Sequence, residues 1–489
     1  MTPTTLLHPY IFRMNQLTVN SPSRSDIPIN LEMATGEHWI VYGNNASGKT
    51  TLLKAIMSSY RITGGSIVYD FYPATSSRTS DNIVYLSFHD QYSCMAGNLY
   101  QLRWNQGLMS QMEAEGHHLP TVGQVLSPTS FGDNVGQQLY EALGIASLSD
   151  KLILSLSSGE FRLFQIAKIL IKHPRLLILE NPFAGLDTSN RQIVAHMLRT
   201  LMQASAIQLI VATCRMPHEM DGFTHVVTVD HGTITKCPVK EFHLPPTPTP
   251  EGQLPSHVRT SGEKVPDIIL KMNHVDISYN GHALLRNVCW EVKKGEKWAL
   301  VGSNGSGKST LLSIICADNP QGYACDITLF GRRRGTGESI WDIKKGIGYV
   351  CPEMFRSYHR PFNVEAIVAS GLYDTAGMYK KISAQDMKLI TPWMEAFHIE
   401  NLRHKLFTEI SDGEKRMVLL TRAFVKNPLL LILDEPFHGL DANNRNLARS
   451  IIEDFCRQPG KTLIMVSHYD DDFPSCIQHR KILHKPIHP

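Results

Sequence analysis

Two segments of the chain carry the residue pattern of a phosphate-binding loop: residues 43–50 (GNNASGKT) and residues 302–309 (GSNGSGKS). Each follows a short apolar run and precedes a run with helical spacing, which is the order of strand, glycine-rich loop and helix that this chemistry requires. Glycines allow backbone N–H groups to surround a phosphate, and the N-terminus of the helix adds its positive dipole end. The alternative, a glycine-rich turn before an ordinary helix, leaves the repeated context unexplained. The sequence therefore predicts two nucleotide-binding loops.

The residues of these loops have separate expected roles. Lys49 and Lys308 would reach the β- and γ-phosphate oxygens, and the hydroxyls of Thr50 and Ser309 would ligate Mg²⁺. The other residues expected to contact ATP are Gly43, Asn44, Gly48 and Thr51 in the first loop and Gly302, Ser303, Asn304, Gly305, Gly307 and Thr310 in the second. The predicted cofactors are therefore ATP and Mg²⁺.

Further motifs recur in the second half of the chain at one common offset. The segments 156–160, 177–183 and 185–187 match the segments 410–414, 431–437 and 439–441. An offset shared by separated motifs indicates a tandem duplication, and a unit of this length is a domain rather than a solenoid repeat.

A proline-rich segment separates the two copies. Residues 244–252 read LPPTPTPEG, a composition that excludes helix and central strand and predicts an extended, semi-rigid linker. In each half, apolar strands alternate with amphipathic helices, which is the pattern of an α/β fold with a parallel sheet. We predict a first P-loop domain over residues 1–240, a linker over 241–266 and a second P-loop domain over 267–489.

Charged residues are expected at the ends of two buried strands. Residues 175–179 form one such run and deliver Glu180 to the carboxyl edge of the sheet, where ligands of α/β sheets bind. In the second half a matching run delivers Asp434, whose oxygens suit the water shell of Mg²⁺. The alternative for Asp434 and Glu435 is a solvated strand end, which Pro436 and the loop behind it disfavour.

Composition narrows the class of protein. The chain has 48 Lys+Arg against 45 Asp+Glu, and a net charge of +3 does not by itself indicate a nucleic-acid or membrane-surface binder. The nine cysteines form no C-x-x-C pair, so neither a disulfide framework nor a zinc or iron–sulfur site is indicated. Because no secretion signal and no long apolar stretch are present, we expect a cytoplasmic protein that does not itself span a membrane.

At these motifs the chain resembles the ATP-binding-cassette ATPases, twice and over nearly its whole length. That family combines a P-loop, an LSGGQ-type signature (here residues 156–160 and 410–414), a Walker B strand ending in Asp-Glu, a D-loop and a switch histidine. Two cassettes of the family close head to tail, so that each ATP lies between one P-loop and the other signature. The resemblance implies two P-loop ATPase domains, each with a parallel-sheet core and a helical subdomain, paired within a monomer.

The resemblance implies that one composite site has every chemical role filled. This site, which we call the hydrolysis site, joins the second P-loop to the first signature. Asp434 would hold Mg²⁺, Glu435 would deprotonate the attacking water, and His468 would bond the γ-phosphate. The remaining expected contacts are the adenine-stacking Tyr279 and the signature residues Ser157 and Gly159.

The other composite site, which we call the holding site, has lost catalytic parts. Asn181 stands at the position of the base, Cys214 at that of the switch histidine, and Asp412 adds a carboxylate near the γ-phosphate. No aromatic residue lies between Leu17 and Leu31 to stack on adenine. Loss of a positioned base lowers a rate by about 10²–10⁴-fold. We therefore expect ATP binding without efficient hydrolysis, through Lys49, Thr50, Glu180, Ser411 and Gly413.

Two features bear on the partner. The segments 87–89 (SFH) and 351–353 (CPE) stand where the family has its Q-loop glutamine, which puts the usual coupling to a transmembrane partner in doubt. Residues 321–345 resemble fused double cassettes of enteric and related bacteria that are assigned to molybdate uptake. Within that run, residues 332–334 are three arginines, which form either a solvated basic turn or a docking patch.

Three classes of function therefore remain open. The chain is either the ATPase of a molybdate importer, bound peripherally to inner-membrane permease subunits, or a soluble regulatory ATPase associated with the ribosome or DNA. The short proline-rich linker, Asn181 and the absence of cysteine pairs argue against the second class, and the sequence gives no clear sign of nucleic-acid binding. A purely structural protein is disfavoured by Asp434, Glu435 and His468.

Overall fold

The computed structural model divides the chain into two compact units, unit 1 (Met1–Pro246) and unit 2 (Thr247–Pro489), which are described separately below. The residues that it describes are 8–21, 27–74, 76–88, 120–127, 137, 140–141, 143–153, 156, 158–204, 207–217, 221–230, 232–245, 254–255, 266–279, 282–352, 354, 358, 361–375, 377–378 and 381–485. Most of the predicted linker lies outside these residues.

Unit 1 is built on a six-stranded sheet, and three of its inner strands (residues 39–42, 176–180 and 208–213) are buried throughout. All of its strand pairs are parallel except the last, which is antiparallel. The strand order is β5 (Ile83–Ser87), β6 (Leu176–Glu180), β7 (Gln208–Thr213), β3 (Trp39–Tyr42), β8 (His225–Asp230) and β9 (Thr233–Pro238).

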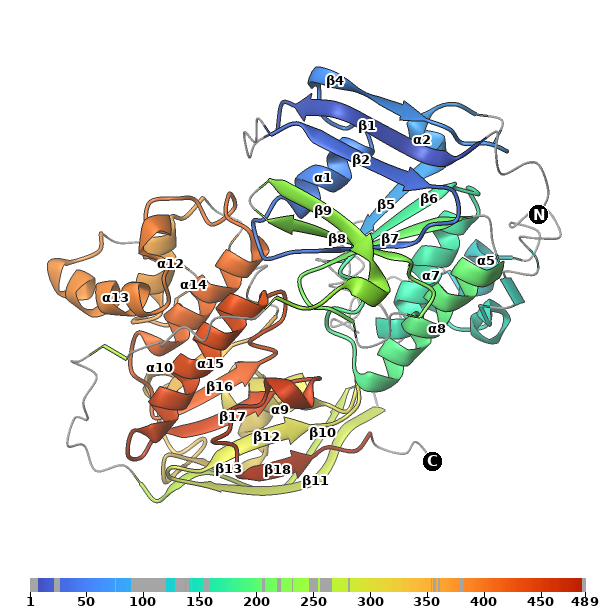
Figure 1. Ribbon diagram of the computed structural model, residues 1–489. Coiled ribbons are helices and arrows are strands. Elements are labelled where there is room, and N and C mark those ends of the chain that lie inside the picture. Colours follow the sequence, from blue (N-terminus) through green and yellow to red (C-terminus); the bar gives the residue numbers. More distant parts are fainter. Residues whose placement is uncertain are drawn as a thin grey trace. The chain divides into compact units, whose positions relative to one another are not determined.

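Helices and a second sheet cover the two faces of this sheet (Figure 1). One face packs on α1 (Lys49–Ile56) and on an antiparallel sheet ordered β2 (Ile29–Ala34), β1 (Tyr10–Val19) and β4 (Ile62–Tyr69). The other face packs on α7 (Ser158–Leu170) and α8 (Thr188–Ala204), with α5 (Val122–Val125) and η3 (Ile145–Leu148) nearby. A four-residue helix, α2 (Thr79–Asn82), leads into β5.

Unit 2 repeats this plan with a five-stranded sheet that is parallel throughout. Its order is β15 (Ile347–Val350), β16 (Leu430–Asp434), β17 (Thr462–Val466), β12 (Lys297–Val301) and β18 (His479–Ile482). A separate antiparallel sheet has the order β11 (His282–Lys293), β10 (Ile268–Tyr279), β13 (Asp326–Leu329) and β14 (Arg332–Arg333).

The helices of unit 2 are divided between the two faces of its parallel sheet. α9 (Lys308–Ile315) packs between the two sheets, and α10 (Ile340–Lys345) precedes β15. The opposite face packs on α12 (Val364–Ser370), α13 (Ala384–Ala396), α14 (Asp412–Phe424) and α15 (Ala442–Arg457). Short 3-10 turns complete the two units: η5 (Val239–Glu241), η7 (Pro320–Ala324), η8 (Glu400–Leu402) and η9 (Asp470–Asp472). The predicted α/β fold with a parallel-sheet core is confirmed in both units.

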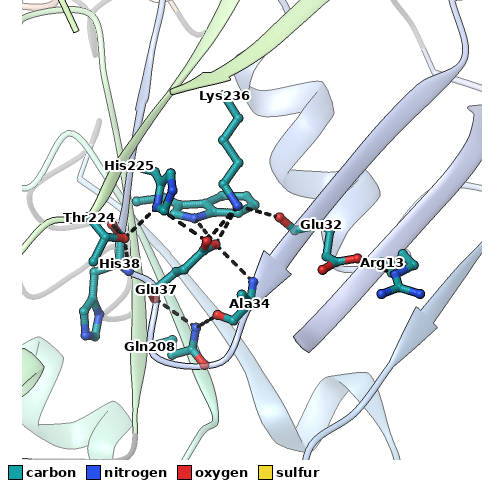
Figure 2. Close-up of polar contacts among 10 residues, drawn as sticks. Arg13, Glu32, Ala34, Glu37, His38, Gln208, Thr224, His225 and Lys236 are labelled. Atoms are coloured by element: carbon teal, nitrogen blue, oxygen red, sulfur yellow. Dashed lines mark hydrogen bonds and ion pairs between the residues drawn. The ribbon is translucent and has the colours of Figure 1, made fainter. Parts of the chain in front are cut away.

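The carboxylate of Glu37 makes several hydrogen bonds at the start of β3 in unit 1 (Figure 2). The glycine-rich loop follows the other end of this strand. Glu37 accepts hydrogen bonds from Trp39 Nε1 at 2.9 Å and from the backbone N–H of Ala34 at 3.0 Å. The ammonium of Lys236 donates to both of its oxygens, at 2.9 and 2.7 Å, and His225 lies 3.5 Å away. These contacts tie the β2–β3 turn to β8 and β9.

Unit 2 repeats this contact at the start of β12. Glu296 accepts hydrogen bonds from Trp298 Nε1 and from the backbone N–H of Lys293, both at 2.9 Å, and His479 Nε2 lies 3.9 Å from it. The duplication that the motifs indicate therefore includes this Glu–Trp contact, which lies outside both glycine-rich loops.

Candidate functional site

Each glycine-rich loop begins where another strand segment comes too close for a side chain. A Cβ atom on Gly43 would lie 2.3 Å from the carbonyl oxygen of Val229, and one on Gly302 would lie 2.5 Å from that of Leu483. Real Cβ contacts are never that short, so only glycine fits at the first position of either loop. In both units the first glycine of the loop is therefore required by close packing against a backbone carbonyl of the same unit.

The two P-loop lysines make equivalent contacts with their own loops. Lys49 and Lys308 are buried first residues of α1 and α9, and each ammonium donates to the first two carbonyls of its loop. The acceptors are Gly43 at 2.8 Å and Asn44 at 2.7 Å in unit 1, and Gly302 at 2.6 Å and Ser303 at 3.0 Å in unit 2. Both ammonium groups therefore lie inside the loop, where a phosphate would be bound.

In each unit a loop hydroxyl meets the carboxylate at the end of the neighbouring strand. Thr50 Oγ1 donates to Glu180 Oε1 at 2.9 Å, and Ser309 Oγ donates to Asp434 Oδ2 at 3.2 Å. Hydroxyl and carboxylate oxygens are suitable Mg²⁺ ligands, and this ion takes its remaining ligands from phosphates and water. Both pairs therefore fit the predicted metal positions.

A tyrosine that the sequence analysis did not single out reaches the same carboxylate in unit 1. The hydroxyl of Tyr85, in the middle of β5, donates to the second oxygen of Glu180. Local spacing along the chain gives no signal of this contact, because Tyr85 and Glu180 are 95 residues apart. The matching residue in β15, Tyr349, is partly buried, and the loss of contact with water is the main cause of its raised pKa.

Glu435 lies directly after β16, in a strained and buried setting. Its φ is +51°, a region that non-glycine residues seldom adopt, and its N–H donates to Val466 O at 3.0 Å. Burial, followed by the negative charges of Asp434 and Asp472, raises its pKa to about 8. His468 Nε2 lies 3.7 Å from its Oε1. The predicted base and switch histidine therefore come together beside the second loop.

Unit 1 keeps this backbone arrangement but changes the side chains. Asn181 has a φ of +52°, and its N–H donates to Ala212 O at 2.8 Å. Cys214, at the position that matches His468, is buried. An amide and a buried thiol leave the unit 1 loop without the base and the imidazole, although the lysine, hydroxyl and carboxylate remain.

The two signature segments lie at the N-termini of α7 and α14. Ser411 is the N-cap of α14, where its Oγ accepts the N–H of Glu414 at 3.3 Å and its own N–H donates to Glu414 Oε2 at 2.7 Å. A Cβ atom on Gly159 would lie 2.3 Å from Asn190 Oδ1, while Gly413 is buried in the first turn of α14. Both helices therefore begin one residue before the signature glycine, at Ser158 and Asp412.

Asp412 is not an isolated charge. Its Oδ1 accepts a hydrogen bond from Lys415 Nζ at 3.0 Å, and it lies in the first turn of α14, where the helix dipole favours a carboxylate. Within unit 2, Lys415 therefore offsets part of the charge of Asp412.

The basic run at residues 332–334 is not wholly solvated, so that interpretation is wrong for its last member. Arg334 is 5% exposed, its Nη1 donates to the carbonyl of Ile314 at 2.9 Å, and its guanidinium lies 4.6 Å from the ring centre of Tyr323. Arg332 and Arg333 remain exposed. The three arginines differ in exposure because only Arg334 contacts the end of α9.

Several predicted residues lie outside the described part of the chain. These are Ser157, the last residues of the two Q-loop segments (His89 and Glu353), and the side chain of Tyr279, whose backbone ends β10. Among the described residues, the remaining predicted ATP contacts (Gly48, Thr51, Asn304, Gly305, Gly307 and Thr310) lie in the two loops or at the starts of α1 and α9. In the same residues, no helix has the length and apolar character needed to cross a membrane.

Comparison with known proteins gives concordant results for the two units. A family model described as "ABC transporter" matches residues 27–184 and 285–438. The chain is 34% identical to the ABC transporter ATP-binding protein ModF of Escherichia coli over 465 residues, which is 92% of each chain. It is 30% identical to an uncharacterised ABC transporter ATP-binding protein of Schizosaccharomyces pombe, covering 92% of this chain and 93% of the relative.

Among solved structures, similarity extends over both units. An archaeal ribosome recycling factor, solved in complex with a ribosomal stalk protein, matches with a TM-score of 0.51 and 17% identity, covering 92% of this chain and 83% of that one. At this identity the match concerns the fold alone.

Proposed function

This chain belongs to the ABC transporter family of ATP-binding proteins and is an ATPase with two cassettes, and from that premise we propose that only one of its two sites hydrolyses ATP. The observation that carries the proposal is the pairing of Glu435 with His468 at 3.7 Å in unit 2. The matching positions of unit 1 hold Asn181 and Cys214, which can neither accept the proton of water nor donate from an imidazole.

In unit 2 we assign each step of hydrolysis to one side chain. Lys308 would exchange its loop carbonyls for phosphate oxygens, and Ser309 and Asp434 would hold Mg²⁺. When bound, that ion neutralises charge on the phosphates. Glu435 would then orient the attacking water and take its proton, and His468 would bond the γ-phosphate.

We place the domain boundaries of this ATPase at residues 1–240 and 267–489, with the linker between them. Following the head-to-tail arrangement of the family, the hydrolysis site takes its signature from unit 1, through Ser157 and Gly159. The holding site takes Ser411 and Gly413 from unit 2. ATP retained by Lys49 and Thr50 would act there as a clamp between the cassettes, which requires a monomer with both units intact.

Replacing the base tests this assignment directly. Glu435→Gln should lower steady-state ATP turnover by about 100-fold or more while ATP binding persists, because the loop is untouched. The matched control is Asn181→Gln, which changes the equivalent residue of unit 1 and should retain most of the turnover. Turnover near that of the wild type in Glu435→Gln would contradict the proposal.

We further propose that the chain serves a molybdate import system, bound to the cytoplasmic side of its inner-membrane permease. The support is the resemblance of residues 321–345 to bacterial double cassettes of that assignment, together with the similarity to ModF. The test is purification of the tagged chain from membrane and cytosol fractions, with molybdate uptake measured in cells that lack it. Recovery only with ribosomes or DNA, and unchanged uptake, would favour the regulatory class instead.

A further inference from the structure

Asp472, a buried carboxylate to which we have assigned no catalytic role, lies near Glu435 in unit 2. Asp472 ends η9 and is 3% exposed, whereas Asp470 at the start of the same turn is 84% exposed and pairs with Arg480 at the surface. Taking a carboxylate out of water is costly unless its oxygens receive hydrogen bonds. The hydrogen-bond partners of Asp472 should therefore indicate its structural role.

Those partners are residues on either side of His468. Ser467 Oγ donates to Asp472 Oδ2 at 2.9 Å, and the same hydroxyl oxygen accepts the N–H of Tyr469 at 3.2 Å. The N–H of Asp472 donates in turn to Tyr469 O at 3.1 Å. A hydroxyl has a single proton, and that of Ser467 points to the carboxylate of Asp472. The lone pairs of the serine oxygen therefore remain to accept the N–H of Tyr469. These three bonds close a turn around His468.

Unit 1 closes the corresponding turn with different hydrogen bonds. Thr213 takes the place of Ser467, and its hydroxyl donates to Arg215 O at 2.7 Å while it accepts the N–H of Arg215 at 3.1 Å. The proton therefore goes to a backbone carbonyl rather than to a carboxylate. In unit 2, which carries His468, the hydroxyl of the turn therefore donates to a carboxylate. In unit 1, the described contacts of the Thr213 hydroxyl include no carboxylate.

We propose that Asp472 is a positioning residue for ATP hydrolysis, which acts through Ser467 Oγ to hold His468 beside Glu435. This inference rests on the proposed hydrolysis by the unit 2 half-site. His468 Nε2 lies 3.7 Å from Glu435 Oε1, so a small change in the turn would alter how both groups meet the γ-phosphate and the attacking water. Misplacement by about 1 Å can cost as much as 10²-fold in rate.

The test uses the full chain with Asp472→Ala, Asp472→Asn, Ser467→Ala and the double variant Ser467→Ala/Asp472→Ala. Asp472→Ala and Ser467→Ala should each lower kcat by about tenfold, with KM and the affinity for a fluorescent ATP analogue changed by less than about twofold. The double variant should be no worse than the poorer single variant, because both act through one contact. Asp472→Asn should recover most of kcat, since its amide oxygen still accepts the serine proton.

Two controls separate positioning from folding. Asp470→Ala removes an exposed carboxylate from the same turn, and Thr213→Ala removes the matching hydroxyl of unit 1; both should keep kcat within about twofold of the wild type. If Asp472→Ala does not fold, Ser467→Ala alone decides the question. Wild-type kcat in Ser467→Ala, or losses that add in the double variant, would overturn the proposal. If Glu435→Gln retained turnover, the proposed catalytic site would fail instead.

Discussion

Asn181 and Glu435 occupy the same backbone position in the two units. Their φ angles are +52° and +51°, and the N–H of each donates to a carbonyl of the adjacent strand, Ala212 O at 2.8 Å and Val466 O at 3.0 Å. Asparagine tolerates this left-handed region better than glutamate does. Unit 1 therefore carries a side chain that suits its backbone, whereas unit 2 holds a buried acid in a strained position, as is common at functional sites.

Removal of the Glu435 charge should stabilise unit 2 at alkaline pH. Its pKa is raised from 4.5 to about 8 in the folded chain, so its contribution to stability is fully present below pH 4.5 and is lost as the pH rises through about 8. Glu435→Gln should therefore raise the melting temperature at pH 9 by roughly 5 °C and leave it nearly unchanged at pH 4.5. Calorimetry without nucleotide measures this, and an equal shift at both pH values would refute it.

The first P-loop should support turnover indirectly. Lys49→Ala removes the ammonium that fills the unit 1 loop, so it should weaken ATP-driven closure and lower steady-state turnover by about tenfold. Lys308→Ala should abolish turnover, because we propose that this lysine binds the phosphates at the site of hydrolysis. Steady-state kinetics of both variants measure the difference. A Lys49→Ala protein with unchanged kinetics would show that the holding site is not a clamp.

The two signatures should respond unequally to the same substitution. Gly159→Asp should damage hydrolysis severely, because donors near the γ-phosphate must lie about 3 Å from it, whereas Gly413→Asp should act only through clamp closure. Gly159 also packs on Asn190, so a side chain there has a steric cost in the fold. Melting temperatures must therefore be measured beside turnover. Equal losses of activity at equal melting temperatures would contradict the head-to-tail pairing.

Arg334 should matter for folding and its neighbour should not. Arg334→Ala removes a buried hydrogen bond to Ile314 O and the packing on Tyr323, and should lower the free energy of unfolding by about 2 kcal/mol. Arg332→Ala changes an exposed side chain and should have an effect below about 0.5 kcal/mol. Denaturant unfolding of the two variants provides the measurement. If the order were reversed, the contacts of Arg334 would not be structural.

Local spacing along the chain determined the two loops, the strand ends and the duplication. The glycines, Lys49 and Lys308 follow from a strand–loop–helix pattern in which neighbouring residues set the backbone, so their positions could be predicted without any tertiary contact. The same holds for Glu180 and Asp434, because a short buried strand carries its last residue to the edge of the sheet.

Only the tertiary structure decided how the side chains around these positions are paired. The bond from Tyr85 to Glu180 and the burial of Arg334 depend on segments that the topology brings together. Burial and nearby charge raise the pKa of Glu435, and neither is visible in the residue type or its spacing. Composition and periodicity specify the backbone, but the energy of a buried polar group depends on which partners the fold places against it.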